Sequence, residues 1–280
     1  MIWLRLAWRR FDLINLHVHT WRCRHAIGTA MEMAEEAARA RLRVLGFAEH
    51  APLPEEIDGW HLPLIEFPAY VAEVEEARSR HPELEILLGL EMDFIPEYEE
   101  FITEFASQTS LDYVIGSVHY IDGWNFDYEG ALAEWEKRDR AEVYHRYFHL
   151  IREMVERIPF EIVGHLDLPK KFGHRLPPEL WDEVEATLEA IRNKGLVLEL
   201  NTAGLRREIA EAYPEGRILR RAAELRIPVT LGTDAHEPEH VAAGLDQALA
   251  YLGTLGYEEI IYFRRRRQLA LPLAELRKSP

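Results

Sequence analysis

The chain is poor in cysteine and has no long hydrophobic run. Its single cysteine, Cys23, excludes an intramolecular disulfide, so the sequence does not require an oxidising compartment. No stretch approaches the ~20 consecutive apolar residues that cross a bilayer. The first twelve residues mix arginines with short apolar runs and lack the uninterrupted apolar region of a signal peptide. We therefore expect a cytoplasmic protein without a membrane partner.

Positive charge is also scarce. The 33 Lys and Arg residues are outnumbered by 49 Asp and Glu residues, which gives a formal net charge of −16. Such a charge repels a phosphate backbone, and the one dense basic run, residues 264–267, is more typical of a solvated surface. We expect no nucleic-acid partner, and the sequence does not indicate an oligomeric state.

Linker-like tracts rich in Pro, Gly or Ser are missing, as are repeats of solenoid length. With 48% hydrophobic residues, a chain of 280 residues can bury a substantial core. We interpret residues 1–280 as one domain, with residues 1–10 as an N-terminal extension.

Short apolar runs alternate with longer segments of helical periodicity, which is the pattern of parallel βα units. The strand-like runs are residues 11–18, 43–49, 85–92, 112–119, 160–167, 196–202 and 228–235, with a weaker eighth run at 260–263. The helical segments are residues 29–41, 66–80, 96–107, 134–157, 178–194, 209–225 and 239–256. Thr29 with Glu32 predicts a capping box, and Gly195 predicts a helix stop. The pattern predicts an α/β fold, a single βα barrel.

Imidazole and carboxylate side chains stand at the C-terminal ends of six of the seven predicted strands. They are His17, His19, His50, Glu91, His119, His165, Asp234 and His236. In a parallel barrel these strand ends meet on one face. Strand formation itself does not favour such side chains there, and together they suit a borderline transition metal. His17 and His19 are two residues apart on one strand, so both can reach the same ion.

Each of these residues taken alone has a simpler explanation. A single histidine near a strand end is more often a hydrogen-bonded core or surface residue, and to that class we assign His61, His81, His145, His149, His174 and His240. Glu91 and Asp234 could each pair with a neighbouring Lys or Arg. The convergence of so many ligand-type side chains on one predicted rim favours a metal site.

Seven segments follow one another along the chain: NLHVHTWRCRHAIG, FAEHAPLP, GLEMDF, VIGSVHYIDGW, VGHLDLPKKFGHR, LELNTAGLRR and LGTDAHEPEHV. In this order they resemble the motifs of the polymerase and histidinol phosphatase (PHP) family, and specifically its histidinol-phosphate phosphatase branch. The resemblance extends from about Phe11 to about Phe263. It implies a distorted, TIM-like (β/α)7 barrel of the PHP type that holds three divalent metal ions, Zn, Fe or Mn. The implied ligand sets are His17, His19, Glu91 and Asp234 for one ion, Glu91 as a bridge to a second ion held by His119 and His165, and His25, His50 and His236 for the third.

The resemblance implies hydrolysis of a phosphate monoester, L-histidinol phosphate, to L-histidinol and phosphate in histidine biosynthesis. Water that bridges two metal ions can reach a pKa of ~7 and act as hydroxide, while the ions clamp the phosphoryl oxygens. A Cys or Ser nucleophile is not needed, and we expect Cys23 to be a structural thiol. Asp234, His236 or a metal-bound water would protonate the leaving alkoxide.

Substrate contacts are expected at the same rim. Arg206 follows the sixth strand and suits bidentate phosphate binding, although a surface cation on a helix is nearly as good an explanation. Lys170 follows the fifth strand, and Asn201 ends the sixth. We expect all three side chains to bind the substrate.

Three residues depart from the family pattern. Asn15 and Glu49 stand where Asp is usual, and Arg24 stands where Gly is usual. A carboxylate at position 15 or 49 would orient a ligand imidazole, so Asn15 is expected to weaken the first metal site. Arg24 is expected to narrow the entrance or to contact phosphate.

Three other functions are compatible with the sequence. Another phosphoesterase of the same family, acting on nucleotides or phosphotyrosine, would keep every ligand and change only the pocket. An amidohydrolase-type deaminase or amidase also begins with His-x-His and ends with a strand-terminal Asp, but His25, Glu91 and His236 suit three metals better than its one or two. A non-catalytic metal-binding scaffold would tolerate loss of ligands, whereas this chain keeps all nine.

Overall fold

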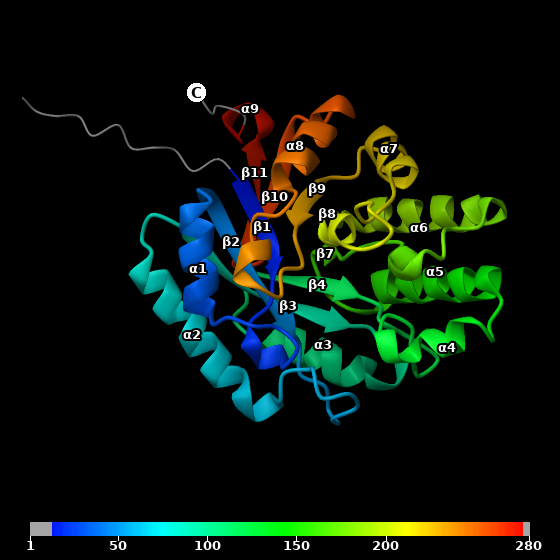
Figure 1. The fold of residues 1–280 in the computed structure, drawn as a ribbon, viewed down its shortest axis with the longest axis horizontal. Helices are drawn as coiled ribbons and strands as arrows, with labels where there is room; N and C mark the ends of the chain where they lie inside the picture. Colours follow the sequence, from blue (N-terminus) through cyan, green and yellow to red (C-terminus); the bar gives the residue numbers. More distant parts are fainter. Residues whose placement is uncertain (1–12, 277–280) are drawn as a thin grey trace, which may run out of the picture.

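The computed structural model describes residues 13–276, so the expected extension at residues 1–10 lies outside the described residues. Figure 1 shows parallel strands at the centre of the molecule with helices around them. The strands are β1 (Leu13–Val18), β2 (Leu42–His50), β3 (Glu85–Asp93), β4 (Tyr113–Ser117), β7 (Ile162–Val163), β8 (Val197–Asn201) and β9 (Val229–Gly232). They form one seven-stranded sheet in the order β1-β2-β3-β4-β7-β8-β9.

The first and last strands of this sheet meet and nearly close it into a barrel. Val18 and Ala235 form a parallel bridge, and the main-chain N–H of His19 donates to the oxygen of Ala235 at 2.9 Å. The predicted α/β barrel of seven strands is therefore confirmed. The fifth strand is shorter than its apolar run suggests, because Ile162 and Val163 alone are paired in it.

Helices cover the outside of the barrel (Figure 1). They are α1 (Ala30–Arg39), α2 (Phe67–Arg80), α3 (Glu99–Gln108), α4 (Leu132–Trp135), α5 (Arg140–Arg157), α6 (Trp181–Lys194), α7 (Gly216–Glu224) and α8 (Leu245–Thr254). The predicted capping box of Thr29 and Glu32 opens α1. Gly195 ends α6, as predicted, in the left-handed conformation at φ 70°.

Three predicted helices are shorter than their periodicity indicates. Residues 239–256 are helical only from Leu245 to Thr254, because a separate 3-10 turn forms at Pro238–His240. Residues 134–157 are divided, because the side chain of Asp139 accepts a hydrogen bond from the main-chain N–H of Glu142 and caps α5 as a new helix. In residues 209–225 the helix begins only at Gly216, because the segment before Gly216 is hydrogen-bonded to the end of β8. The main chain of Tyr213 pairs there with that of Asn201 in an antiparallel bridge.

Tyr113 on β4 fills the interior of the barrel. Its hydroxyl oxygen lies 2.6 Å from the main-chain oxygen of Leu16 and 2.9 Å from that of Phe47. Gly46 and Gly89 leave space for this ring, since a Cβ atom at either position would lie under 3.0 Å from it. The ring therefore ties β4 to β1 and β2 just before these strands end.

The C-terminal residues form a separate hairpin, so the weaker eighth run is a strand outside the barrel. β10 (Glu259–Arg264) pairs antiparallel with β11 (Arg267–Pro272), and α9 (Leu273–Leu276) follows. At the turn between them, Nε of Arg266 donates to Oε1 of Glu161 at 2.6 Å, just before β7 begins. The basic run is thus part of a structural contact at the base of the barrel.

Short elements occupy the loops at the C-terminal ends of the strands. A 3-10 turn, η1 (Trp21–Cys23), follows β1, and another, η5 (Leu168–Phe172), follows β7. A small hairpin of β5 (Tyr120–Ile121) and β6 (Trp124–Asn125) follows β4. Within residues 13–276, no helix has both the length and the apolar character needed to cross a membrane.

Candidate metal centre

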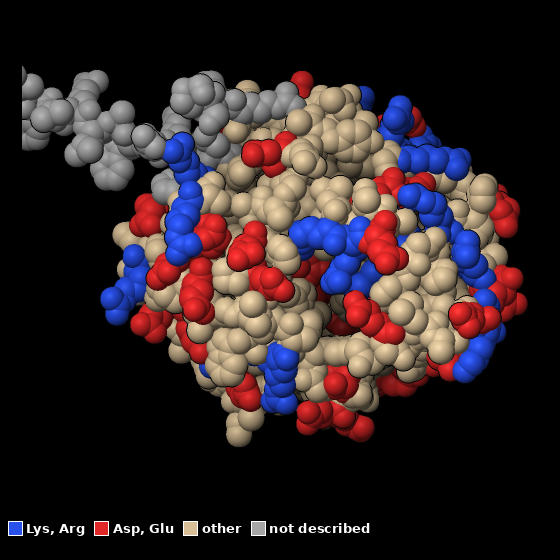
Figure 2. Space-filling view, viewed as in Figure 1, with Lys and Arg blue, Asp and Glu red and all other residues tan. Residues whose placement is uncertain are grey.

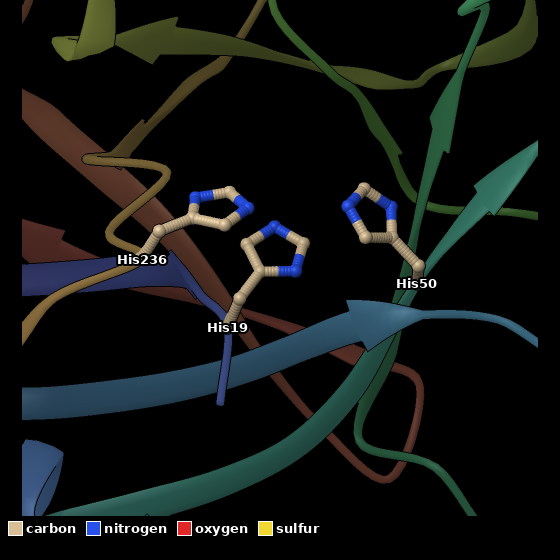
Figure 3. Close-up of side chains that lie close together, drawn as sticks. All are labelled: His19, His50 and His236. Carbon is tan, nitrogen blue, oxygen red and sulfur yellow. The ribbon is translucent and has the colours of Figure 1, made fainter. Parts of the chain in front are cut away.

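The nine side chains predicted as metal ligands meet at the C-terminal ends of the barrel strands. They are His17 and His19 on β1, His25 after η1, His50 at the end of β2, Glu91 on β3, His119 after β4, His165 after β7, and Asp234 and His236 after β9. Figure 3 shows the imidazoles of His19, His50 and His236 gathered from three separate parts of the chain. Figure 2 shows a recess near the middle of the molecule, with Asp and Glu atoms visible inside it and Lys and Arg side chains along its upper edge.

Four of these side chains form a close group around the end of β1. The Nε2 atoms of His17 and His19 are 3.1 Å apart. Oε2 of Glu91 lies 3.4 Å and 3.5 Å from these two atoms, and Oδ1 of Asp234 lies 3.8 Å and 3.3 Å from them. A tetrahedral Zn²⁺ with ligands at about 2.0–2.1 Å keeps its ligand atoms about 3.3 Å apart. The group therefore has the spacing of a single metal site.

The other oxygen of Glu91 faces a second group. Oε1 of Glu91 lies 2.8 Å from Nε2 of His165 and 3.6 Å from Nε2 of His119. The two Nε2 atoms are themselves 3.2 Å apart. Glu91 thus offers one oxygen to each group, as a bridging carboxylate does.

The rings of the third predicted set also lie near one another. The ring centroid of His25 lies 4.5 Å from that of His236 and 5.4 Å from that of His50, while His50 and His236 are 6.2 Å apart. The ring of His19 lies 4.3 Å from that of His236, so this set adjoins the first group. The nine residues form one continuous cluster.

The arrangement of the imidazole nitrogens fits bound cations. Nδ1 of His17 lies 2.7 Å from the carboxylate of Glu199, so Nδ1 carries the ring proton and Nε2 is left with a lone pair. This Nε2 faces the Nε2 of His19, and the Nε2 atoms of His119 and His165 face each other in the same way. Two facing lone pairs at this distance repel unless a proton or a metal ion lies between them. A donor set of imidazole and carboxylate suits Zn, Fe or Mn.

Three buried carboxylates bind the Nδ1 side of imidazoles that are predicted as metal ligands. Each accepts a hydrogen bond from an Nδ1 atom: Glu199 from His17 at 2.7 Å, Glu49 from His19 at 3.3 Å, and Asp93 from His119 at 2.8 Å. Only Glu49 is among the sequence predictions. Glu199 had a usable signal, since a carboxylate within the apolar run VLELN needs a buried partner.

The side chain of Asn15 binds Thr233 and main-chain groups and does not bind an imidazole, which corrects its predicted role. Its Nδ2 donates to Oγ1 of Thr233 at 2.6 Å and to the main-chain oxygen of Val241 at 2.8 Å. Its Oδ1 accepts from the main-chain N–H of His17 at 3.0 Å. Both amide protons are used, which a carboxylate could not provide, and the His17 ring is oriented by Glu199 instead.

Asn201 is fully buried and supports Glu199. Its Nδ2 donates to Oε2 of Glu199 at 3.1 Å, and its Oδ1 accepts from the main-chain N–H of Ala203 at 2.9 Å. Both polar groups of the side chain are therefore used within the protein. These contacts place Asn201 next to Glu199 and behind His17, and its contact with substrate stays a prediction.

The two predicted phosphate-binding cations are placed differently from each other. Lys170 is buried, and its ammonium lies 3.0 Å from the carboxylate of Asp167 and donates to the oxygen of Ala212 at 2.7 Å. The turn η5 directs it there, so the structure does not bring Lys170 to the metal centre. Arg206 donates through Nη2 to the main-chain oxygen of Thr233 at 2.6 Å, next to Asp234. Its buried Nη1 has no hydrogen-bond partner among residues 13–276.

Cys23 and Arg24 lie next to His25 in the chain but are turned to other partners. The buried thiol of Cys23 donates to the main-chain oxygen of Thr20 at 3.2 Å, and burial raises the pKa of this thiol. Arg24 is about half exposed and pairs with Glu66 at 3.4 Å. The Cys23 thiol is therefore not presented as a nucleophile, whereas the phosphate contact of Arg24 stays a prediction.

Burial and mutual charge shift the pKa values of the cluster. Burial opposes charge on Glu91 and Asp234, yet the neighbouring His17 holds the pKa of both carboxyls well below the usual range. Burial, aided by the charge on His19, lowers the pKa of His50 to about 4. The carboxylates are thus anionic and His50 is neutral at pH 7. Although burial opposes it, the neighbouring carboxylates raise the pKa of His19 to about 9 and that of His119 to about 10, so a bound metal ion would displace protons from these imidazoles.

Several known proteins that resemble this chain in sequence or fold are named as histidinol phosphatases. The family model of the PHP domain matches residues 15–203. A protein named "Probable histidinol-phosphatase" from Deinococcus radiodurans is 40% identical over 91% of this chain and 98% of its own length, and the histidinol-phosphatase of Bacillus subtilis is 28% identical over 79% and 92%. The histidinol phosphate phosphatase of Lactococcus lactis, solved with Zn, L-histidinol and phosphate, has a TM-score of 0.80 at 21% identity and covers 92% of this chain and 99% of its own. The chain belongs to the PHP domain family.

Proposed function

We propose that this protein is a metal-dependent histidinol-phosphatase, which hydrolyses L-histidinol phosphate to L-histidinol and phosphate in histidine biosynthesis. The observation that carries the proposal is the cluster of nine His, Glu and Asp side chains whose donor atoms face one another at the end of a PHP barrel. The relatives from D. radiodurans and B. subtilis bear the name of this activity, which supports the choice of substrate.

Three divalent ions, Zn, Fe or Mn, would occupy the cluster. The proposed ligands are His17, His19, Glu91 and Asp234 for the first, Glu91, His119 and His165 for the second, and His25, His50 and His236 for the third. The Zn in the L. lactis protein supports zinc as one of these metals. When bound, the ions supply an activated nucleophile and neutralise the charge of the phosphate.

Side chains of the protein would bind the phosphate and protonate the leaving oxygen. Arg206 holds a buried guanidinium N–H without a partner in the described part of the chain, which suits a charge-assisted hydrogen bond to a phosphoryl oxygen. Asp234 and His236 have side chains that are 21% and 24% exposed, whereas His17 and His19 are fully buried. We propose that one of these two partly exposed groups, Asp234 or His236, donates a proton to the leaving oxygen.

The first experiment is phosphate release from L-histidinol phosphate by protein whose metal content has been counted by elemental analysis, with and without added Mn²⁺ or Zn²⁺. Turnover with two to three ions per chain is the expected result. Metal binding with turnover on nucleotide or phosphotyrosine substrates, and none on L-histidinol phosphate, would contradict the substrate and favour another phosphoesterase of the same family.

Replacement of His119 tests the centre directly. His119→Ala should lose the second ion and nearly all turnover while the circular dichroism spectrum stays unchanged. His145→Ala is the matched control, because His145 also pairs with a carboxylate, that of Glu183 at 2.9 Å, but lies exposed on α5. Retained turnover in His119→Ala would refute its role as a ligand.

A further inference from the structure

His61 is not one of the nine predicted ligands, but it contacts the group that orients one of them. It lies on the loop between β2 and α2 and is 8% exposed. Its Nδ1 lies 2.7 Å from Oδ2 of Asp58, and its Nε2 lies 3.0 Å from Oδ2 of Asp93. Because both ring nitrogens face carboxylate oxygens, both donate, and neither has a lone pair left for a metal ion.

Asp93 links His61 to His119, one of the proposed metal ligands. Its Oδ1 accepts from Nδ1 of His119 at 2.8 Å and from the main-chain N–H of the same residue at 3.0 Å. The buried carboxylate of Asp93 is therefore held on one side by His61 and on the other by His119. A carboxylate fixed in this way presents the free Nε2 of its imidazole partner in one direction.

Asp58 anchors the other end of the chain of contacts. Its Oδ1 accepts from the main-chain N–H groups of Trp60 at 2.9 Å and of His61 at 3.3 Å. Its Oδ2 also accepts from the hydroxyl of Tyr120, the residue that follows His119. The loop after β2 is thus fastened directly to the segment that carries His119 through Tyr120, and indirectly through His61 and Asp93.

We propose that His61 is a positioning residue of the metal centre: by bridging two carboxylates it fixes Asp93, and through Asp93 it orients His119. This inference rests on the ligand role of His119 in the proposed function. Partners that hold a ligand imidazole contribute about 10- to 100-fold to metal affinity or activity. His61 therefore raises the affinity of the second metal group through Asp93, and its ring also lies beside that of His50, with the centroids 5.8 Å apart.

The test measures affinity for Zn²⁺ alone, by competition with a chromophoric chelator, on the full-length protein. His61→Ala removes both hydrogen bonds, whereas His61→Arg supplies a guanidinium that can donate to both carboxylates. His145→Ala again serves as the control for loss of a histidine paired with a carboxylate away from the centre. Circular dichroism and the thermal midpoint show whether each variant is folded.

We expect His61→Ala to weaken one bound Zn²⁺ by about 10- to 100-fold and to leave the other ions unchanged. His61→Arg and the control should keep the affinity of the unaltered protein. Full affinity in a folded His61→Ala protein, or an equal loss at every site, would overturn the proposal.

A second pair of variants decides the matter if His61→Ala does not fold. Met has a flexible side chain of similar size and no N–H donor, so His61→Met should bind the second ion more weakly than His61→Arg, and equal affinities would overturn the proposal. Because Zn²⁺ is the only ligand used, an absence of turnover on L-histidinol phosphate would refute the substrate assignment without changing this result.

Discussion

The carboxylate of Glu199 on β8 lies 2.7 Å from Nδ1 of His17 on β1, on the side of the ring that faces away from the metal cluster. The other oxygen of Glu199 accepts from the main-chain N–H of His165 at 2.7 Å. One buried carboxylate therefore holds residues from two of the proposed metal groups. Its position depends in turn on Asn201, which donates to the same oxygen.

Glu199→Gln should reduce turnover by about 10- to 100-fold with little change in fold. The amide has the shape of the carboxylate, but it carries no charge and can accept through one oxygen only. The His17 ring then loses the acceptor that fixes its Nδ1 proton, and Nε2 becomes a poorer ligand. Elemental analysis and kcat on L-histidinol phosphate, measured on the same preparation, check this outcome.

Glu185→Gln is the control for this substitution, since the carboxylate of Glu185 lies on α6 and pairs with Arg221 near the surface. It should keep full metal content and turnover. Equal activities of the two variants would show that Glu199 does not act through the metal centre.

The meeting of the nine side chains could be predicted because the direction of each strand decides on which face of the barrel its last residues lie. His17 and His19 are two residues apart at the end of an apolar run, and alternation along a strand points both to the same side. Glu91 and His165 follow equally apolar runs, so the barrel topology alone brings them together. His25 lies in a loop after η1, and its inclusion depended on the family resemblance.

The supporting and substrate residues could not be predicted equally well, because loop geometry decides where they point. Lys170 follows the right strand, but η5 turns its ammonium back onto Asp167, three residues earlier. His61 contacts Asp93 across 32 positions of sequence from a loop without periodicity. No local pattern marks such a contact.

Arg206→Ala should raise the KM for a phosphate monoester by about 10- to 100-fold, the equivalent of one charge-assisted hydrogen bond. Its Nη1 has no hydrogen-bond partner within residues 13–276, whereas Nη2 donates to the main-chain oxygen of Thr233 next to Asp234. Metal content should fall much less than the affinity for substrate. Steady-state kinetics with elemental analysis of the same sample check both parts.

Arg192→Ala is the control, since Arg192 is an exposed cation in the last turn of α6. It should leave KM unchanged. A KM in Arg206→Ala equal to that of the control would assign Arg206 to a structural role.

Cys23→Ser should retain nearly all turnover. The thiol is fully buried, burial raises its pKa, and it donates to the oxygen of Thr20, a bond that a serine hydroxyl can also make. Iodoacetamide should not alkylate the native protein, although it should modify the unfolded chain. Loss of activity in Cys23→Ser with unchanged metal content would give the thiol a part in the reaction.

Arg266→Ala should destabilise the protein by about 1–3 kcal/mol without changing kcat. Arg266 donates to Glu161 at 2.6 Å and to the main-chain oxygen of Ala106 at 3.3 Å, at the base of the barrel and opposite the metal centre. Without it, Glu161 is left in a partly buried position where burial already raises its pKa. Urea unfolding followed by circular dichroism measures the change in free energy, and Arg267→Ala, an exposed neighbour, is the control. An equal loss of stability in both variants, or a fall in kcat for Arg266→Ala alone, would contradict the assignment of this contact to the base.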